Sequence, residues 1–165
     1  MSDFAIAHIC LNGHVSTSKS DEFKTKRPFC SLCGELVITT CPKCETPIHG
    51  SFRKRSYIQN IPYHYSPGYS KPSYCFNCGA AFPWTQFSIN AANELVKCAE
   101  QLNEAEKEDF KTSINDLLKN TPKTAVAEVK FKKYALKAGS EIAKGLKDIL
   151  VDLVSETVKK SIWNN

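Results

Sequence analysis

The first half of this 165-residue chain is built around the stretch CSLCGELVITTCPKC, which runs from Cys30 to Cys44. It contains two Cys-x-x-Cys pairs, and each pair has a partner on its outer side. A Cys-x-x-x-His pair stands upstream at Cys10 and His14, and a third Cys-x-x-Cys pair stands downstream at Cys75 and Cys78. A two-residue gap holds both sulfurs on one tight turn, aimed at a single ion. The four pairs therefore predict two four-coordinate zinc sites.

The spacing of the cysteines favours metal binding over a secreted disulfide framework. Seven of the eight cysteines belong to these pairs, and the opening residues MSDFAIAH lack the basic and apolar segments of a signal peptide. We therefore expect a reducing compartment, the cytoplasm. No run of about eighteen uncharged apolar residues is present, so no membrane-spanning segment is predicted.

The four pairs can be grouped in two ways. Residues 29–39 (FCSLCGELVIT) resemble residues 74–85 (YCFNCGAAFPWT), and this weak repeat favours sequential grouping in a double zinc ribbon. The alternative is a cross-brace of the ubiquitin-ligase type, in which pairs one and three share an ion; the histidine in the first pair does not match its usual order. Sequential grouping predicts two ligand sets: Cys10, His14, Cys30 and Cys33, then Cys41, Cys44, Cys75 and Cys78.

Both sets are complete with four side chains, so neither leaves the open position of a catalytic zinc. We expect two structural ions and no enzyme, since no nucleophile–base pair or phosphate-binding loop is recognisable. His8, His49 and His64 are expected to be ordinary histidines outside the ligand sets. Few aliphatic residues remain to form a core in residues 1–85, so removal of the metal should unfold this half.

The insert between the third and fourth pairs is the candidate partner surface. Basic residues interleaved with tyrosines can contact a protein, stack on single-stranded nucleic acid, or simply pack against the metal sites. The net charge of +5 is mild, and four of the five excess positive charges lie in residues 1–85. The candidate contact residues are Arg53, Lys54, Arg55, Tyr57, Tyr63, Tyr65 and Tyr69.

Residues 86–165 are rich in Ala, Leu, Glu and Lys and predict about three helices. Asn103 with Glu106 forms a capping-box pattern at the start of the second helix, and Thr121-Pro122 marks the start of the third. The third is predicted as one long amphipathic helix over residues 122–163. Its apolar stripe needs a cover, either the other helices, a second copy of the chain, or a membrane surface. The unpaired Cys98 is expected to be a small buried hydrophobe.

The motifs ICLNGHV (9–15), FCxxCG (29–34), CPxC (41–44) and CxxCGxxxPWT (75–85) resemble an uncharacterised bacterial domain-of-unknown-function family. The similarity continues through the helical segment LKDILVDLVSETV (146–158), so it covers most of the chain. The resemblance implies a bacterial origin, a cytoplasmic setting and the same zinc ligands, but it implies no activity.

The sequence thus predicts a small metal-stabilised α+β fold, with a double zinc ribbon at 1–85 and a helical region at 86–165. The expected function is a non-enzymatic adaptor that contacts a protein partner, with a helical docking or oligomerisation region. A nucleic-acid-binding ribbon is the alternative, and a cross-braced module of the ligase type is the second alternative.

Overall fold

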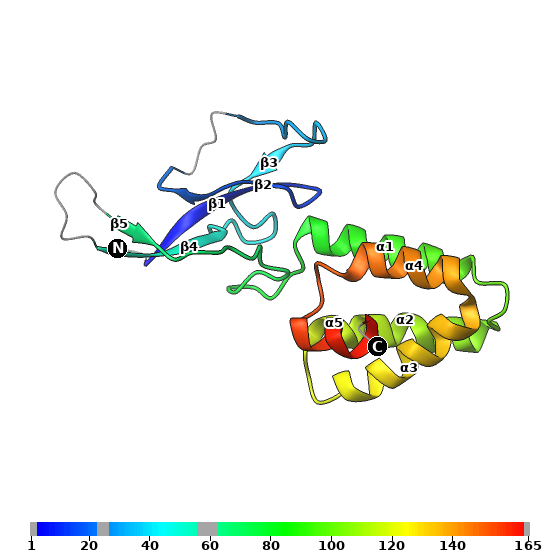
Figure 1. The fold of residues 1–165 in the computed structure, drawn as a ribbon. Coiled ribbons are helices and arrows are strands. Elements are labelled where there is room, and N and C mark those ends of the chain that lie inside the picture. Colours follow the sequence, from blue (N-terminus) through cyan, green and yellow to red (C-terminus); the bar gives the residue numbers. More distant parts are fainter. Residues whose placement is uncertain (1–2, 23–26, 56–62, 164–165) are drawn as a thin grey trace. The chain divides into compact units, whose positions relative to one another are not determined.

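The computed structural model describes residues 3–22, 27–55 and 63–163, and it divides the chain into two compact units. Unit 1 comprises Met1–Gln86 and contains the strands, and unit 2 comprises Phe87–Asn165 and contains most of the helical residues (Figure 1). No helix in the described part of the chain combines the length and apolarity needed to cross a membrane.

An antiparallel sheet forms the frame of unit 1. The strands follow the order β2-β1-β4-β5, and β3 pairs with the C-terminal end of β1. The central strand β1 is buried from Ala5 to Cys10, because it has neighbours on both edges. The strands are β1 (Phe4–Cys10), β2 (Val15–Ser20), β3 (Val37–Ile38), β4 (His49–Arg55) and β5 (Tyr63–Tyr65).

Strands β2 and β4 also approach each other closely, although β1 lies between them in the pairing order. A Cβ atom on Gly50 would lie 2.2 Å from the carbonyl oxygen of Ser18, so this position has room only for glycine. The hydroxyls of Ser18 and Ser51 are hydrogen-bonded at 2.9 Å across the same gap. The register of β1 shifts against both β2 and β4, which lets the sheet coil strongly.

The cores of unit 1 are small and contain metal-ligand cysteines. One cluster joins Ile9, Ile48, Phe82 and Trp84 with Cys41 and Cys75, and a second consists of Cys10, Cys30 and Val37. The indole of Trp84 stacks on Phe82 and donates a hydrogen bond to the carbonyl of Pro72. Much of the buried surface of this unit therefore depends on the cysteine side chains.

Unit 2 packs its helices around one hydrophobic core. The core contains sixteen buried residues from Ala92 to Val158, among them Phe110 and Phe131 with rings in an edge-to-face arrangement. The predicted capping box is present, since Asn103 and Glu106 each accept a hydrogen bond from the other's backbone N–H. The helices are α1 (Pro83–Lys97), α2 (Glu104–Lys119), α3 (Thr124–Ala138), α4 (Ser140–Leu150) and α5 (Glu156–Trp163).

The prediction of one long helix over residues 122–163 is wrong, because this segment forms the three helices α3, α4 and α5 (Figure 1). Gly139 ends α3 with φ 98° and ψ 161°, a conformation that is essentially restricted to glycine. A turn over residues 151–154 then separates α4 from α5. The two breaks let the apolar stripe fold back onto α1, α2 and α3, which explains how a stripe of this width is covered within the unit.

Two smaller expectations also fail. Helix α1 starts at Pro83, earlier than the change in composition suggested, with proline in the first turn, where a missing N–H costs nothing. Cys98 is exposed just beyond the C-terminal end of α1, so it is not a buried hydrophobe.

Candidate metal centres

The first candidate centre collects the four side chains of Cys10, His14, Cys30 and Cys33, whose ligand atoms all lie within 4.8 Å of one another. His14 Nδ1 lies 3.5 Å from Cys10 Sγ, 3.3 Å from Cys33 Sγ and 3.7 Å from Cys30 Sγ. The sulfurs of Cys10 and Cys33 are 3.7 Å apart. Strand β1 delivers Cys10, and the turn before β3 delivers the two later cysteines.

The second candidate centre collects four thiols: Cys41, Cys44, Cys75 and Cys78. The sulfurs of Cys41 and Cys78 are 3.8 Å apart, and those of Cys44 and Cys75 are 3.6 Å apart. The grouping is sequential in both centres, so the cross-braced arrangement is not the one that this chain adopts.

These distances agree with tetrahedral coordination. A tetrahedron with metal–sulfur bonds of about 2.3 Å has edges of about 3.8 Å, and a shorter metal–nitrogen bond shortens the edges at histidine. The measured separations between ligand atoms, 3.3 to 3.8 Å, fall in this range. They are far longer than a disulfide bond of about 2.05 Å. The donor sets therefore fit one tetrahedral metal ion each.

The three Cys-x-x-Cys pairs lie in three turns of the same type. The N–H of the first cysteine donates to the carbonyl five residues later (Glu35, Thr46 or Ala80), and the N–H four residues later donates back to the first cysteine. A bridge closes each turn: Phe29 with Leu36, Thr40 with Pro47, and Tyr74 with Ala81. The repeat seen in the sequence at two pairs thus extends to the third.

A left-handed residue follows the second cysteine in each of these turns. Gly34 and Gly79 take this position with φ of 76° and 69°. In the turn that holds Cys41 and Cys44, the position is taken by Glu45, with φ 58°. The missing glycine after Cys44 is the reason that the Cys41–Cys44 pair was not recognisable as part of the repeat. A non-glycine residue in this conformation carries a strain of about 1 kcal/mol or more.

The first pair uses a different turn. The N–H of Gly13 donates to the carbonyl of Cys10, and the N–H of His14 lies 3.3 Å from Cys10 Sγ. Gly13 has φ 87°, and a Cβ there would lie 2.8 Å from both Lys71 Nζ and Trp84 Cβ. This glycine is therefore required both by the backbone conformation and by close packing.

The hydrogen bonds around the second centre stabilise thiolates unequally. The hydroxyl and the backbone of Thr46, with the amide of Asn77, lower the pKa of Cys44 to about 6. At Cys78 the backbone N–H of Ala80 lowers the pKa, but burial and the neighbouring sulfurs outweigh it and raise the pKa to about 11. Four adjacent thiols cannot all ionise without a compensating cation, so the cluster needs a metal ion to be fully deprotonated.

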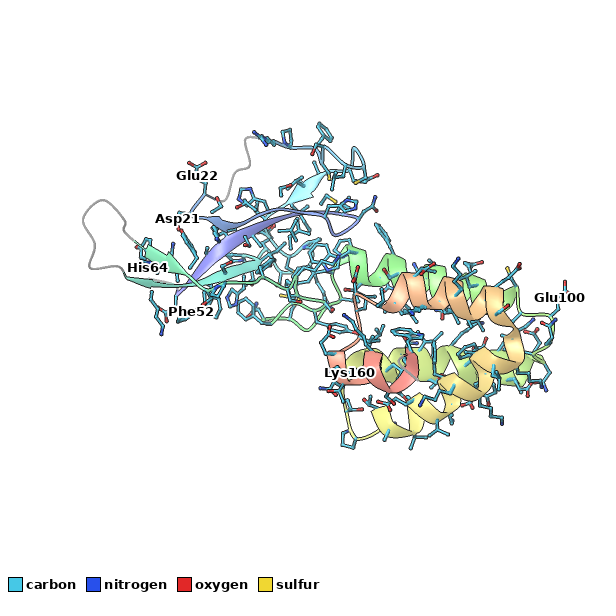
Figure 2. The ribbon with its side chains drawn as sticks, viewed as in Figure 1. Asp21, Glu22, Phe52, His64, Glu100 and Lys160 are labelled. Atoms are coloured by element: carbon cyan, nitrogen blue, oxygen red, sulfur yellow. The ribbon has the colours of Figure 1, made fainter. Side chains whose placement is uncertain are left out.

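The predicted partner-contact residues are only partly available. Arg53 forms an ion pair with Asp21 and lies over the ring of Tyr63, 4.7 Å from its centroid, so its side chain is largely covered. Asp21 and His64 lie at the end of the sheet that carries the β4–β5 pair (Figure 2). Lys54 is exposed on β4.

The remaining predicted partner-contact residues differ in their surroundings. Tyr65 is half-buried with Lys19 Nζ 5.6 Å from its ring centroid. The hydroxyl of Tyr69 donates to the carbonyl of His49 at 2.7 Å, and burial raises the pKa of Tyr69 to about 12, so this tyrosine packs within the unit. The backbone of Arg55 pairs with Tyr63, and Tyr57 lies outside the described residues.

Sequence reasoning missed the apolar surface at the metal sites. Val15, Phe29, Leu32 and Leu36 are exposed by 44, 63, 77 and 45 %, and we call these four residues the first-centre patch. Val15, Phe29 and Leu32 line a hollow of about 500 Å³ beside the first centre. The sequence contained a signal for Leu32 alone, because the two residues between paired cysteines face outward when both sulfurs face the ion.

Two of the histidines outside the ligand sets, His8 and His49, make specific contacts within unit 1. His8 is buried, and its Nε2 lies 2.9 Å from the carbonyl oxygen of Glu22. His49 is stacked between Phe4 and Phe76, with ring centroids 4.4 and 3.9 Å away, and burial lowers its pKa. Because Phe76 lies between the ligands Cys75 and Cys78, this stack packs their turn against the sheet.

Comparison with known proteins adds a family but no activity. No curated protein and no solved structure gives a significant match. The model of a family described as uncharacterized proteins conserved in bacteria, DUF2321, matches residues 3–162. The match covers nearly the whole chain, including both metal centres, helices α1 to α4 and α5 up to residue 162, and it confirms the resemblance drawn from the cysteine motifs. The chain therefore belongs to the bacterial family DUF2321.

Proposed function

We propose that this protein is a non-enzymatic protein-interaction module whose N-terminal unit is held together by two structural zinc ions. The observation that carries the proposal is the combination of two complete four-ligand centres with an exposed apolar patch at the first of them. Four protein ligands saturate a tetrahedral zinc ion, which leaves no position for substrate. Thiolate-rich sites suit zinc, and free thiols persist in the reducing cytoplasm.

The first-centre patch is the proposed contact surface for a protein partner. Leu32 is 77 % exposed at the tip of its turn, and Phe29 is 63 % exposed beside it. Exposed apolar residues that cluster on a rigid support are typical of protein-binding sites. The metal supplies the rigidity, because the patch residues Phe29 and Leu32 flank the ligand Cys30 on either side.

Capture of partners from a bacterial lysate with the zinc-loaded chain tests this proposal. The substitution Leu32→Glu should abolish the specific captures, since it places a charge at the centre of the patch. The matched control is Phe87→Glu, which places the same charge on an exposed hydrophobic residue of α1. Native mass spectrometry should show two zinc ions bound to each variant. Identical captures with wild type and Leu32→Glu would refute a role for the patch.

A nucleic-acid-binding role is the second candidate, favoured by the basic and aromatic side chains near the β4–β5 pair. Lys54 is exposed and Lys19 lies over Tyr65, an arrangement that suits phosphate contacts beside a stacking platform. The ion pair of Arg53 with Asp21 weakens the case, because it neutralises one of the predicted phosphate contacts. Fluorescence anisotropy with labelled single-stranded RNA and DNA at two salt concentrations decides between the candidates. Tight binding that Lys54→Glu weakens and salt suppresses would favour this second role.

We further propose that residues 122–163 provide the docking or oligomerisation region of the module. Most of the apolar stripe predicted there is buried in the core of unit 2. The residues available for association are therefore those that stay exposed on the helices of this segment. Light scattering of the purified chain over a range of concentrations would detect self-association.

A further inference from the structure

Helix α3 has a second apolar face that points away from the core of unit 2. Its inner face is buried through Ala127, Phe131, Tyr134 and Ala138. Its outer face exposes Val126, Val129 and Leu136 by 59, 68 and 87 %. Within the described residues of unit 2, the other exposed large hydrophobic residue is Phe87 on α1. The exposed apolar residues of this unit are thus concentrated on one helix.

The spacing of these residues is that of a helix–helix seam. Val126, Val129, Lys133 and Leu136 follow one another at intervals of three, four and three residues, which places them along one line on the helix. Lys133 extends over the ring of Tyr134, with Nζ 5.2 Å from the centroid, and this leaves its apolar stem on the seam. From Val126 to Leu136 the line is about 15 Å long, enough for two to three turns of a partner helix.

An apolar groove adjoins the seam at Leu136. It has a volume of about 400 Å³ and lies between α3, α4 and α5. Small residues (Ala135, Gly139 and Ala143) line it together with Ile162 and Trp163. A large side chain from a partner can therefore insert beside Leu136, as anchors do in helix-binding grooves.

The charge on α3 indicates which kind of partner helix would bind to its outer face. The helix carries four lysines and one acid, Glu128, whose carboxylate accepts a hydrogen bond from the hydroxyl of Ser161. Lys130 and Lys137 are paired with acids of α2. Within the described residues Lys132 and Lys133 form no ion pair; Lys133 lies on the seam and Lys132 lies beside it. A second copy of α3 would bring lysines against lysines, so an acidic partner is favoured.

We propose that the outer face of α3, with the adjoining groove, binds an acidic amphipathic helix of a partner protein. This inference rests on the proposed function and deepens it, since it names the partner chemistry for the docking region. The apolar side of the partner would cover Val126, Val129 and Leu136, and its acidic residues would face Lys132 and Lys133.

Fluorescence anisotropy with a labelled model peptide tests the proposal on the full zinc-loaded chain. The probe is an amphipathic peptide of about three heptads, with leucine on one face and glutamate on the other. We expect saturable binding that Leu136→Glu weakens at least tenfold. The matched control Phe87→Glu places the same charge on an exposed hydrophobic residue of α1 and should bind like wild type. The double variant Lys132→Glu/Lys133→Glu should weaken binding and reduce its salt dependence.

Three outcomes would overturn the inference. Absence of saturable peptide binding, or equal losses in Leu136→Glu and Phe87→Glu, would refute the seam. Binding to vesicles containing phosphatidylglycerol but not to the peptide would assign the face to a membrane surface. Self-association that Leu136→Glu abolishes, without peptide binding, would assign it to a second copy. None of these outcomes changes the result of the Leu32→Glu capture, so failure here is distinguishable from failure of the proposed function.

Discussion

Glu45 stands where the equivalent turns of this protein have glycine. Its φ of 58° costs an L-residue about 1 kcal/mol, and glycine adopts this conformation freely. We expect Glu45→Gly to raise the free energy of unfolding of unit 1 by about this amount. Gly34→Ala should lower it similarly, because a Cβ at Gly34 meets no atom within 4 Å and only the backbone conformation is penalised.

Guanidinium denaturation in a zinc buffer measures both changes. The free metal concentration must be held constant, because metal binding contributes to the apparent stability. Unchanged stability in both variants would contradict a strained left-handed conformation at these turns.

Asp109 links α2 to α3 and makes the stability of unit 2 depend on pH. Its carboxylate accepts hydrogen bonds from Lys130 Nζ at 2.6 Å and from the hydroxyl of Tyr134 at 2.7 Å. The bond from Lys130, and then that from Tyr134, hold the pKa of Asp109 below its ordinary value of 3.8. The same carboxylate raises the pKa of Tyr134 from 10.0 to about 12.

The two pKa shifts act at opposite ends of the pH scale. A lowered carboxyl pKa adds stability above 3.8 that is lost as the pH falls through the folded-state value. A raised tyrosine pKa adds stability below 10 that is lost as the pH rises toward 12. We expect Asp109→Asn to reduce both losses, measured as the melting temperature of the helical signal at acidic, neutral and alkaline pH. Parallel pH profiles in the two proteins would argue against this role.

At the scale of the elements, Gly50 allows β4 to pass β2. A Cβ there would lie 2.2 Å from the backbone oxygen of Ser18, and backbone atoms cannot move aside without displacing the strand. Gly50→Ala should therefore destabilise unit 1 by roughly 3 kcal/mol or more. Gly68→Ala is the control, because Gly68 has φ 74° but open space around it and should cost only about 1 kcal/mol. Retention of metal and tertiary spectra in Gly50→Ala would contradict the close approach.

Gly139 separates α3 from α4. Its φ of 98° and ψ of 161° are accessible to glycine alone, although a Cβ there would have open space. We expect Gly139→Ala to cost about 1–3 kcal/mol through backbone strain. Each kilocalorie should lower the melting temperature by about 4–8 °C in a unit of this size. The control Gly145→Ala lies inside α4, where the new Cβ meets only the flexible end of Leu95, so little change is expected.

At the scale of the whole molecule, the two units should differ in their need for metal. The cores of unit 1 include ligand cysteines, whereas the sixteen-residue core of unit 2 contains none. We expect a strong chelator to unfold unit 1 and to leave the helices of unit 2 folded. Nuclear magnetic resonance of the full chain would then show collapsed signals for residues 3–86 and dispersed signals for residues 87–163. Simultaneous loss of both sets would contradict this independence.

Single substitutions separate the two centres. Removal of Cys10 should release one ion and leave the second centre intact, because the centres share no ligand. Cys98→Ser should leave both ions bound, since Cys98 belongs to neither set. Native mass spectrometry counts the ions directly, and loss of both ions from Cys10→Ser would contradict the independence of the two centres.

The sequence by itself determined the features that depend on neighbouring residues. Paired cysteines two residues apart share one turn wherever they occur, so the ligand pairs were readable, whereas their grouping into two sets was favoured only by a weak repeat. The capping box at Asn103 was readable for the same reason, because a cap depends on residues three positions apart.

Only the tertiary structure decided the features that depend on distant segments. The long apolar stripe of residues 122–163 fits one helix or three equally well, and Gly139 selects three through a backbone conformation that spacing does not reveal. The exposure of Leu32 and Leu136, and the pairing of Arg53 with Asp21, likewise follow from which segments pack together. Side-chain chemistry is local, whereas burial and pairing belong to the folded chain, and the candidate binding surfaces are therefore visible only in three dimensions.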